Sequence, residues 1–296
     1  MATKNHSIAF AFDAQPQANP SPRRSSKRAN NLDGATWTKY SLSIWNDIKK
    51  SPDEIALRHP AIFPVSLVRR LIQCFACPED KVVLDPFAGS GSTLVGAMIE
   101  GKRGVGFEIV QSYLDLCAQR LAKRHLPFGG ASTPLPIAHK VDSRQMMQIL
   151  PLNSIDLCIT SPPYWDILSR KRTADYKKTR DYGDETQDLA KIHGYWEFLS
   201  ELGKVFEQVF RVLKPGKYCI VNVMDLRKKD RFYPYHSDLA TKLKSLGFIF
   251  DDLIIWDRQG EYNNLRPLGF PSVFRINKVH EYLLIFQKPL KTEPRN

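Results

Sequence analysis

Short apolar runs alternate along the chain with segments in which apolar residues recur every three or four positions. The runs have the length and composition of buried strands, and the recurring pattern predicts amphipathic helices. Strands are expected at 81–84, 104–108, 137–141, 155–160, 218–223, 253–257 and 281–286. Helices are expected at 64–74, 93–100, 111–124, 189–213 and 237–246. This alternation predicts a mostly parallel sheet with helices on both faces.

The start of the chain lacks both patterns. It combines Gln, Asn, Pro and Ser with a basic run at 23–28, which predicts a flexible basic tail over 1–34 and a single folded domain over 35–296. With 296 residues, of which 43% are hydrophobic, the chain can bury a full core, and a wholly disordered protein is excluded. The longest apolar run near the start, 7–12, is far below the roughly 20 residues of a membrane span. We therefore expect a soluble, cytoplasmic protein.

Charge and cysteine content narrow the class of protein further. The chain carries 43 Lys and Arg against 31 Asp and Glu, a formal net charge of +12, and basic surfaces attract polyanions such as nucleic acid. Five cysteines, an odd number in mostly apolar segments, do not predict a disulfide framework. Cys74 and Cys77 form a Cys-x-x-Cys pair, but neither a second pair nor a nearby histidine completes a zinc site, so we expect no metal.

A glycine-rich segment, Asp-Pro-Phe-Ala-Gly-Ser-Gly-Ser-Thr over 85–93, joins a predicted strand to a predicted helix. Its backbone can approach a ligand closely, and the following helix offers unpaired N–H groups, so a cofactor site is expected there. The segment lacks the Lys-Ser/Thr pair of an ATP-binding loop and the third glycine of a dinucleotide fingerprint. Glu108 and Asp142 follow the next two strands, where carboxylates can accept from ribose hydroxyls and an adenine amino group. Each also suits a local role as a helix cap.

The strand at 155–160 is followed by Ser161-Pro162-Pro163-Tyr164. Two prolines fix the backbone and remove two N–H donors, which leaves carbonyl oxygens in fixed directions. With the Ser161 hydroxyl as a further acceptor and Tyr164 as a stacking face, this corner suits the exocyclic amine of a flipped-out base. The amine becomes nucleophilic as acceptors hold its hydrogens, so positioning is the main catalytic contribution. Two prolines alone would more commonly indicate only a turn.

Together, the loop at 85–91 and the Ser161–Tyr164 motif about 70 residues further on resemble those of the amino-group DNA methyltransferases. This S-adenosylmethionine-dependent family acts on cytosine N4 or adenine N6. The similarity extends from about Trp45 to the C-terminus and includes the segments 59–64, 213–217 and 277–282. It implies an α/β fold: a Rossmann-like, doubly wound, mostly parallel seven-stranded sheet with one antiparallel edge strand.

The resemblance also implies S-adenosyl-L-methionine as the cofactor and assigns roles to residues of this chain. The catalytic residues would be Ser161, Pro162, Pro163 and Tyr164. The cofactor-binding residues would be His59, Phe63, Asp85, Phe87, Gly89, Ser90, Gly91, Ser92, Thr93, Glu108 and Asp142.

Ser161 stands where adenine-N6 members of the family usually carry Asp, so the resemblance favours cytosine N4 as the methyl acceptor. Adenine N6 remains an alternative, because some members with Ser-Pro-Pro-Tyr methylate adenine, and structured RNA is another. Methylation of cytosine carbon 5 is not expected, since it needs a cysteine nucleophile, usually in a Pro-Cys pair, and the sequence has no such pair. From another class, a catalytically silent DNA-binding module could keep this fold, although the intact motifs argue against it.

Double-stranded DNA is expected to be recognised by two basic loops, at about 168–195 and 226–236. Their lysines and arginines suit phosphates, although a basic run can also be a solvated face. The candidate residues are Arg170, Lys171, Arg172, Lys177, Lys178, Arg180, Arg227, Lys228, Lys229 and Arg231. With no large separate recognition domain evident, the recognised site should be short, or a second subunit of a homodimer should help to recognise it. The family also implies a restriction-modification or orphan setting, with a companion restriction endonuclease in the first case, and no membrane association.

Overall fold

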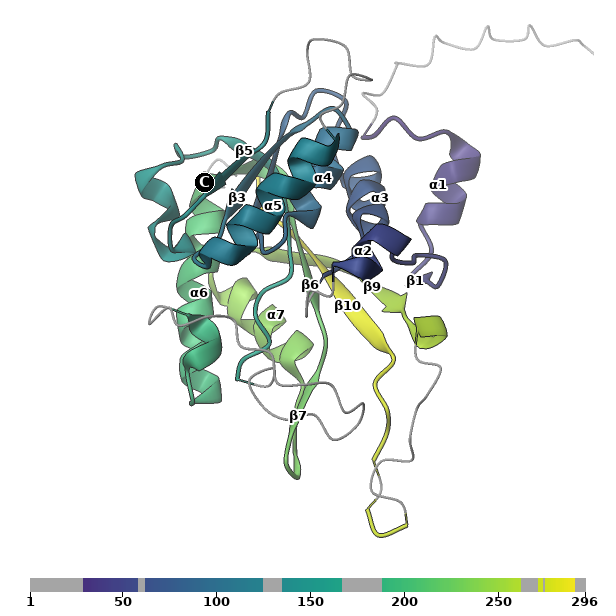
Figure 1. Cartoon of the computed structure of the whole chain (residues 1–296), viewed down its shortest axis with the longest axis vertical. Coiled ribbons are helices and arrows are strands. Elements are labelled where there is room, and N and C mark those ends of the chain that lie inside the picture. The colour runs from purple at the N-terminus through teal and green to yellow at the C-terminus, as the bar shows by residue number, and fades with distance from the viewer. Residues whose placement is uncertain are drawn as a thin grey trace, which may run out of the picture.

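The computed structural model describes residues 29–57, 62–124, 135–166, 188–261, 271–273 and 275–290. One large sheet forms the centre of the molecule, with strand order β1-β9-β10-β6-β5-β2-β3-β4 (Figure 1). The strands are β1 Ile44–Trp45, β2 Val82–Asp85, β3 Arg103–Phe107, β4 Ile137–His139, β5 Ile155–Thr160, β6 Leu213–Val223, β9 Ile249–Asp257 and β10 His280–Gln287. A separate antiparallel hairpin is formed by β7 Leu226–Lys228 and β8 Arg231–Tyr233.

Helices cover both faces of the sheet. They are α1 Gly34–Tyr40, α2 Pro52–Ala56, α3 Val65–Phe75, α4 Ser92–Ile99, α5 Gln111–Arg124, α6 Tyr195–Val212 and α7 Tyr235–Ser245, with short 3-10 turns η1 Ser143–Gln148, η2 Leu189–Lys191 and η3 Gln259–Glu261. Successive strand residues point to opposite faces. Val83 and Leu157 accordingly belong to the cluster that includes α3, whereas Leu84 and Cys158 belong to the cluster that includes α6 and α7. Because both faces are buried, the strands appear in the sequence as uninterrupted apolar runs.

The predicted α/β class and the doubly wound, mostly parallel sheet are confirmed. Two details of the sheet differ from the prediction. Among the described residues it has eight strands instead of seven, because the two-residue β1 pairs in parallel with β9. The antiparallel strand, β10, is not at an edge, since it pairs with both β6 and β9. An interior place satisfies both rows of its backbone hydrogen bonds and buries its apolar residues on both faces.

The bounds of three predicted elements also differ. The helix expected over 189–213 is divided, because 192–194 is extended between η2 and α6. β6 begins at Leu213 and so includes the Lys-Pro-Gly segment that precedes the expected strand. The stretch 226–236, expected as a loop, forms the β7–β8 hairpin and the start of α7. The short elements α1, α2 and β1 have no counterpart in the apolar pattern.

The N-terminal residues that the structure describes contact the domain. Asn30 donates from Nδ2 to the Cys74 carbonyl at 3.1 Å, and Leu32 packs against the α3 side of the core. Asp33 caps α1 by accepting from the Thr36 N–H. Within the described ranges no helix has the length and apolar character needed to cross a membrane.

The parallel strands β2, β3, β4, β5 and β6 all end at one edge of the sheet. β10 runs in the opposite direction and begins at this edge, where Tyr282 is paired with Val223. The glycine-rich loop follows β2, and the Ser161–Tyr164 motif follows β5, its direct neighbour. The topology therefore places the two main sequence motifs side by side, at the edge where open α/β sheets bind ligands.

Candidate active site

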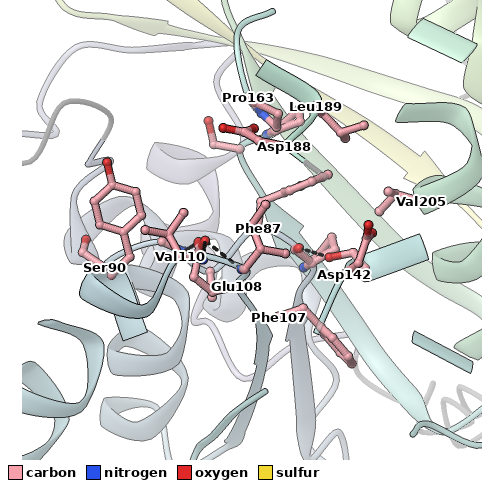
Figure 2. Close-up of a pocket in the computed structure, with 18 of the residues that line it drawn as sticks. Phe87, Ser90, Phe107, Glu108, Val110, Asp142, Pro163, Asp188, Leu189 and Val205 are labelled. Carbon is pink, nitrogen blue, oxygen red and sulfur yellow. Dashed lines mark hydrogen bonds between the residues drawn. The ribbon is translucent and has the colours of Figure 1, made fainter. Parts of the chain in front are cut away.

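A cleft opens at this edge, between the loop after β2 and the segment after β5 (Figure 2). Figure 2 shows Glu108 and Asp142 on either side of Phe87, with Pro163 and Asp188 across the cleft. The predicted site residues that line it are Phe63, Phe87, Gly89, Ser90, Ser92, Glu108, Asp142, Ser161, Pro162 and Pro163. Lining residues that the sequence patterns do not single out include Ile62, Ile109, Val110, Tyr113, Asp188, Leu189 and Val205. Predicted cofactor and amine residues thus meet at one cleft.

The glycine-rich loop has a backbone shape that favours glycine. Gly89 and Gly91 have positive φ angles of 49° and 80°. Gly91 is also the N-cap of α4, and a β-carbon there would lie 2.3 Å from Sγ of Cys117 on α5. The chain can therefore turn tightly from β2 into α4, which brings the N-terminus of α4 to the cleft at Ser92.

Asp85 lies beneath this loop and not in the cleft. Its fully buried carboxylate accepts from Thr160 Oγ1 at 2.6 Å, from Thr93 Oγ1 at 2.7 Å and from the Phe87 N–H at 3.0 Å. Burial raises the pKa of Asp85 to about 6, against the opposing effect of these donors. Among the residues predicted to contact the cofactor, Asp85, Gly91 and Thr93 do not line the cleft, and the contacts of Asp85 hold the loop from beneath.

Glu108, directly after β3, has its carboxylate at the cleft. Oε2 accepts from the Gly89 N–H, and Oε1 accepts from the N–H groups of Ile109 and Val110, each at 2.9 Å. Burial raises the pKa of Glu108 to about 7, although these backbone donors favour the charged form. The side chain thus ties the glycine-rich loop to β3, and with three of its roughly four lone-pair sites in use, the one left on Oε2 can accept from a ribose hydroxyl.

Asp142 also lines the cleft, but much of its acceptor capacity is used within the protein. It caps η1 by accepting from the Arg144 N–H at 2.9 Å, and it forms an ion pair with Arg144 Nη2 at 2.6 Å. Arg144 is in turn held by Glu201 of α6 at 2.7 Å. The local role as a helix cap is therefore present, and an adenine amino group would share this carboxylate with Arg144.

A half-buried arginine that no sequence pattern singles out holds the loop from α5. Arg120 Nη1 donates to the Ser90 carbonyl at 2.7 Å and to the hydroxyls of Ser90 and Ser92 at 3.0 and 3.2 Å. Its Nη2 lies 3.7 Å from Oε1 of Glu54, which also accepts from the Val65 N–H at 2.7 Å. The chain from α2 to α3 is thereby connected to the cofactor loop. Near it, Phe63 lines the cleft, whereas His59 lies outside the described residues.

The Ser161–Tyr164 motif forms the opposite wall of the cleft. Ser161, Pro162 and Pro163 line it, and the half-buried Tyr164 does not. The Pro163 carbonyl accepts from Tyr235 Oη at 3.3 Å, and the Tyr235 ring packs edge-on against Tyr164 at a centroid distance of 6.5 Å. Burial, and then the charge of Glu281, raise the pKa of Tyr164 well above its usual value, so its hydroxyl keeps the proton. The motif is thus braced by α7 and β10.

The predicted DNA-binding residues fall into two groups. Those of the first loop, at 170–180, lie outside the described residues. Those of the second are on the β7–β8 hairpin, which projects from the main sheet (Figure 1) and exposes Arg227, Lys229 and Arg231. Lys228 differs from these three, because its Nζ pairs with Asp166 at 2.6 Å and lies 3.6 Å from the Trp165 ring centroid. Strand alternation turns Lys228 toward Asp166, so a phosphate would compete with that carboxylate for its charge.

The sheet is open and mostly parallel, and one edge carries the glycine-rich loop, the Glu108 carboxylate and the Ser161–Tyr164 motif. This combination is typical of a Rossmann-like methyltransferase domain. The chain matches the DNA methylase family of the N6/N4 type over residues 2–119 and 155–296, which is most of its length, and it belongs to that family.

Individual relatives match shorter stretches. The chain is 30% identical over 182 residues to the Type II methyltransferase M.MjaI of Methanocaldococcus jannaschii, which covers 53% of this chain and 59% of the relative. It is 48% identical over 64 residues to the Type II methyltransferase M.ScaI of Streptomyces caespitosus, covering 21% and 20%. It is 36% identical over 105 residues to the orphan methyltransferase M.BamHII of Bacillus amyloliquefaciens, covering 33% and 39%. The matches thus span about three fifths or less of these relatives.

Among solved structures, the chain is similar to a Thermus thermophilus DNA modification methylase, TTHA0409, complexed with S-adenosyl-L-methionine. The identity is 27%, the match covers 52% of this chain and 56% of the other, and the TM-score is 0.36.

Family membership makes S-adenosyl-L-methionine the cofactor of this site. The residues present fit that group. Gly89 lines the cleft with a positive φ of 49° and carries no side chain, so the loop backbone is bare where a ligand approaches. Glu108 supplies an acceptor for a ribose hydroxyl, and Phe63 and Phe87 supply apolar walls.

Cofactor affinity is expected to increase with pH across neutrality. The ionised Glu108 accepts better from a ribose hydroxyl, and its pKa of about 7 in the unliganded protein leaves it mostly protonated at pH 6. If only the ionised form binds well, affinity should fall about tenfold between pH 8 and pH 6. Isothermal titration calorimetry of the wild type and Glu108→Gln measures this. The variant should bind more weakly and with a flat pH profile, and an equally steep profile in both would contradict the assignment.

Proposed function

We propose that the protein transfers a methyl group from S-adenosyl-L-methionine to the exocyclic N4 of cytosine in duplex DNA. The observation that carries the proposal is the placement of Ser161 and Pro162 on the wall of the same cleft as Glu108 and the glycine-rich loop. When bound, the cofactor supplies a methyl group on a positively charged sulfur. In the transfer, the amine nitrogen would bond to the methyl carbon as the sulfur leaves, and the proton that the nitrogen sheds would pass to solvent.

The chain's own residues act mainly by positioning. The Ser161 hydroxyl and the Pro162 carbonyl would accept the two amine hydrogens, which turns the nitrogen lone pair out of the ring plane and toward the cofactor. The two prolines fix the carbonyl directions, and Tyr235 holds the next carbonyl, that of Pro163, at 3.3 Å. The preference for cytosine rests on Ser161, where adenine-N6 members of the family usually carry Asp. Adenine N6 is the second candidate.

The product identifies the function. Plasmid DNA lacking methylation is incubated with the purified chain and S-adenosyl-L-methionine, digested to nucleosides and analysed by mass spectrometry. N4-methylcytosine is the expected product. N6-methyladenine would replace cytosine by adenine as the target, and 5-methylcytosine would overturn the site assignment. If the chain binds cofactor and DNA but methylates neither DNA nor structured RNA, it is a silent DNA-binding module.

Double-stranded DNA is the proposed partner, and the β7–β8 hairpin is one proposed contact. Arg227, Lys229 and Arg231 are exposed on it. The centroid of the exposed Phe232 ring lies 5.5 Å from Cζ of Arg227 and 5.1 Å from Nζ of Lys278. Cations grouped around an exposed ring suit phosphates and a base edge. The loop at about 168–195, most of which lies outside the described residues, is proposed as the other contact.

Charge reversal on the hairpin is expected to weaken DNA binding regardless of sequence. For the triple variant Arg227→Glu, Lys229→Glu, Arg231→Glu, affinity should fall, and the slope of log affinity against log salt should decrease by about 0.9 for each phosphate that the hairpin no longer neutralises. Fluorescence anisotropy over a salt series measures both. Lys244→Glu, an exposed cation in the last turn of α7, is the matched control and should change neither. An unchanged slope in the triple variant would refute the assignment of the hairpin to DNA.

The cellular setting is proposed from the relatives. They include Type II methyltransferases and an orphan methyltransferase, so we place the protein in a restriction-modification pair or an orphan modification role. Methylation-sensitive sequencing of host DNA would give the recognised site, and a search for cleavage at that site would reveal a companion endonuclease. Light scattering would test the homodimer.

A further inference from the structure

Glu281 is a buried carboxylate behind the candidate active site; it lies in the family-like segment 277–282, but the sequence gives it no role. It is the second residue of β10, with 6% of its surface exposed. Oε2 accepts from Tyr164 Oη at 3.2 Å and from Asn222 Nδ2, and Oε1 forms an ion pair with Arg258 Nη1. Three donors from three separate segments therefore converge on one side chain.

These contacts determine which way the hydrogen bond between Tyr164 and Ser161 runs. The two hydroxyl oxygens are 3.4 Å apart, and geometry alone allows either to donate. An ionised carboxylate can only accept, so the single proton of Tyr164 is directed at Glu281. The Tyr164 oxygen is then left as an acceptor, and the Ser161 hydroxyl must be the donor between them. The lone pairs of Ser161 remain for another donor.

We propose that Glu281, acting through Tyr164, is a positioning residue that makes the Ser161 hydroxyl an acceptor for the target amine. The inference rests on the proposed function, because it needs Ser161 to hold an amino group. We call the hydrogen bonds that run from Ser161 through Tyr164 to Glu281 the relay. Without the relay, a serine hydroxyl is free to rotate and to point its hydrogen at the amine, where it would oppose binding. With the relay, the hydroxyl is oriented before the substrate arrives.

The relay also supplies negative charge to a motif that has none of its own. Where Asp begins the motif, the acceptor is itself a carboxylate, whereas Ser161 is neutral. A carboxylate at the end of a chain of hydrogen bonds polarises the hydroxyls along it and strengthens the acceptor at the other end. In the transfer, positive charge develops on the amine nitrogen, so a stronger acceptor stabilises the transition state more than the ground state.

The competing explanation is that Glu281 only pairs with Arg258 and joins β10 to the loop after β9. Arg258 offers a matched control, because it also pairs with the exposed Glu261 at 2.7 Å. Glu261→Gln removes a carboxylate from the same arginine without touching Tyr164. Tyr164→Phe removes the relay hydroxyl and leaves Glu281, Asn222 and Arg258 in place, so it tests the relay even if Glu281→Gln were to fold poorly.

The experiment measures single-turnover methylation of duplex DNA by the wild type, Glu281→Gln, Tyr164→Phe, the double variant and Glu261→Gln. Calorimetry and anisotropy give the cofactor and DNA affinities of each. Each relay variant is expected to slow the chemical step by about 10- to 100-fold. Both affinities should stay within about twofold of the wild type, and Glu261→Gln should match the wild type in all three measurements. The double variant should be no slower than the slower single variant, because both changes interrupt the same chain of hydrogen bonds.

Two results would overturn the relay while the proposed function stands. One is Tyr164→Phe methylating within twofold of the wild-type rate. The other is a double variant whose loss equals the product of the two single losses, since independent contributions multiply. A wild type that produces neither N4-methylcytosine nor N6-methyladenine would instead overturn the proposed function and, with it, this inference.

Discussion

Asp85→Ala is expected to lower S-adenosyl-L-methionine affinity by more than about 100-fold, or roughly 2.7 kcal/mol, and to destabilise the fold as well. Asp85 does not line the cleft, so the loss is expected through the loop. Without the carboxylate, the Phe87 N–H and the Thr160 hydroxyl lose their buried acceptor. Buried donors left without a partner cost about 1–3 kcal/mol each, and the loop can pair them only by moving.

A matched control separates loop geometry from general instability. Asp80 is also buried and also accepts from a backbone N–H, that of Cys77 at 2.8 Å, but it precedes β2 and lies at the opposite end of the strand from the cleft. Asp80→Ala should lower the midpoint of urea unfolding to a similar degree and keep cofactor affinity within about threefold. Calorimetry and urea unfolding on both variants test this. Cofactor binding by Asp85→Ala at wild-type affinity would show that the loop does not depend on Asp85.

A fully buried strand and an amphipathic surface helix could be predicted best from the sequence. The predicted bounds of β5, Ile155–Thr160, and of α5, Gln111–Arg124, coincide with those of the structure. All six β5 residues are buried, and a run of that kind has few alternatives once a turn motif follows it. The two main motifs could be assigned to one edge because parallel strands all end on the same side.

The polar side chains around the site could not be predicted, because their environment comes from distant parts of the chain. Arg120 and Lys228 look like solvent-facing cations in local sequence, yet one is bonded to the glycine-rich loop and the other to Asp166. Glu281 meets Tyr164 across 117 positions of sequence. Two signals were available for Glu281: it lies in the family-like segment 277–282, and an antiparallel strand begins there, at the edge where the parallel strands end.

The relay predicts an unusual result for Ser161→Asp, the change that gives the motif the residue usual in adenine-N6 members. The Tyr164 hydroxyl would then lie between two carboxylates and could donate to only one. At roughly 6 Å and an effective dielectric constant of about 20, the two charges repel by about 3 kcal/mol. Ser161→Asp alone is therefore expected to slow single-turnover methylation by about 100-fold. Ser161→Asn, which is similar in size and neutral, should be the faster of the two.

Adding Glu281→Gln to Ser161→Asp should recover at least about tenfold of the lost rate, because it removes the second charge and leaves Tyr164 to donate to the introduced carboxylate alone. The same Glu281→Gln change is expected to slow the wild type, so its effect should change sign between the two backgrounds. If Glu281 were merely structural, Glu281→Gln would slow methylation in both backgrounds, since the pairing of Glu281 with Arg258 and Asn222 is the same whichever residue stands at 161. Single-turnover rates of the four proteins, with the methylated nucleoside identified by mass spectrometry, decide the matter. If Glu281→Gln slows both backgrounds by the same factor, the carboxylate does not act through Tyr164 on position 161.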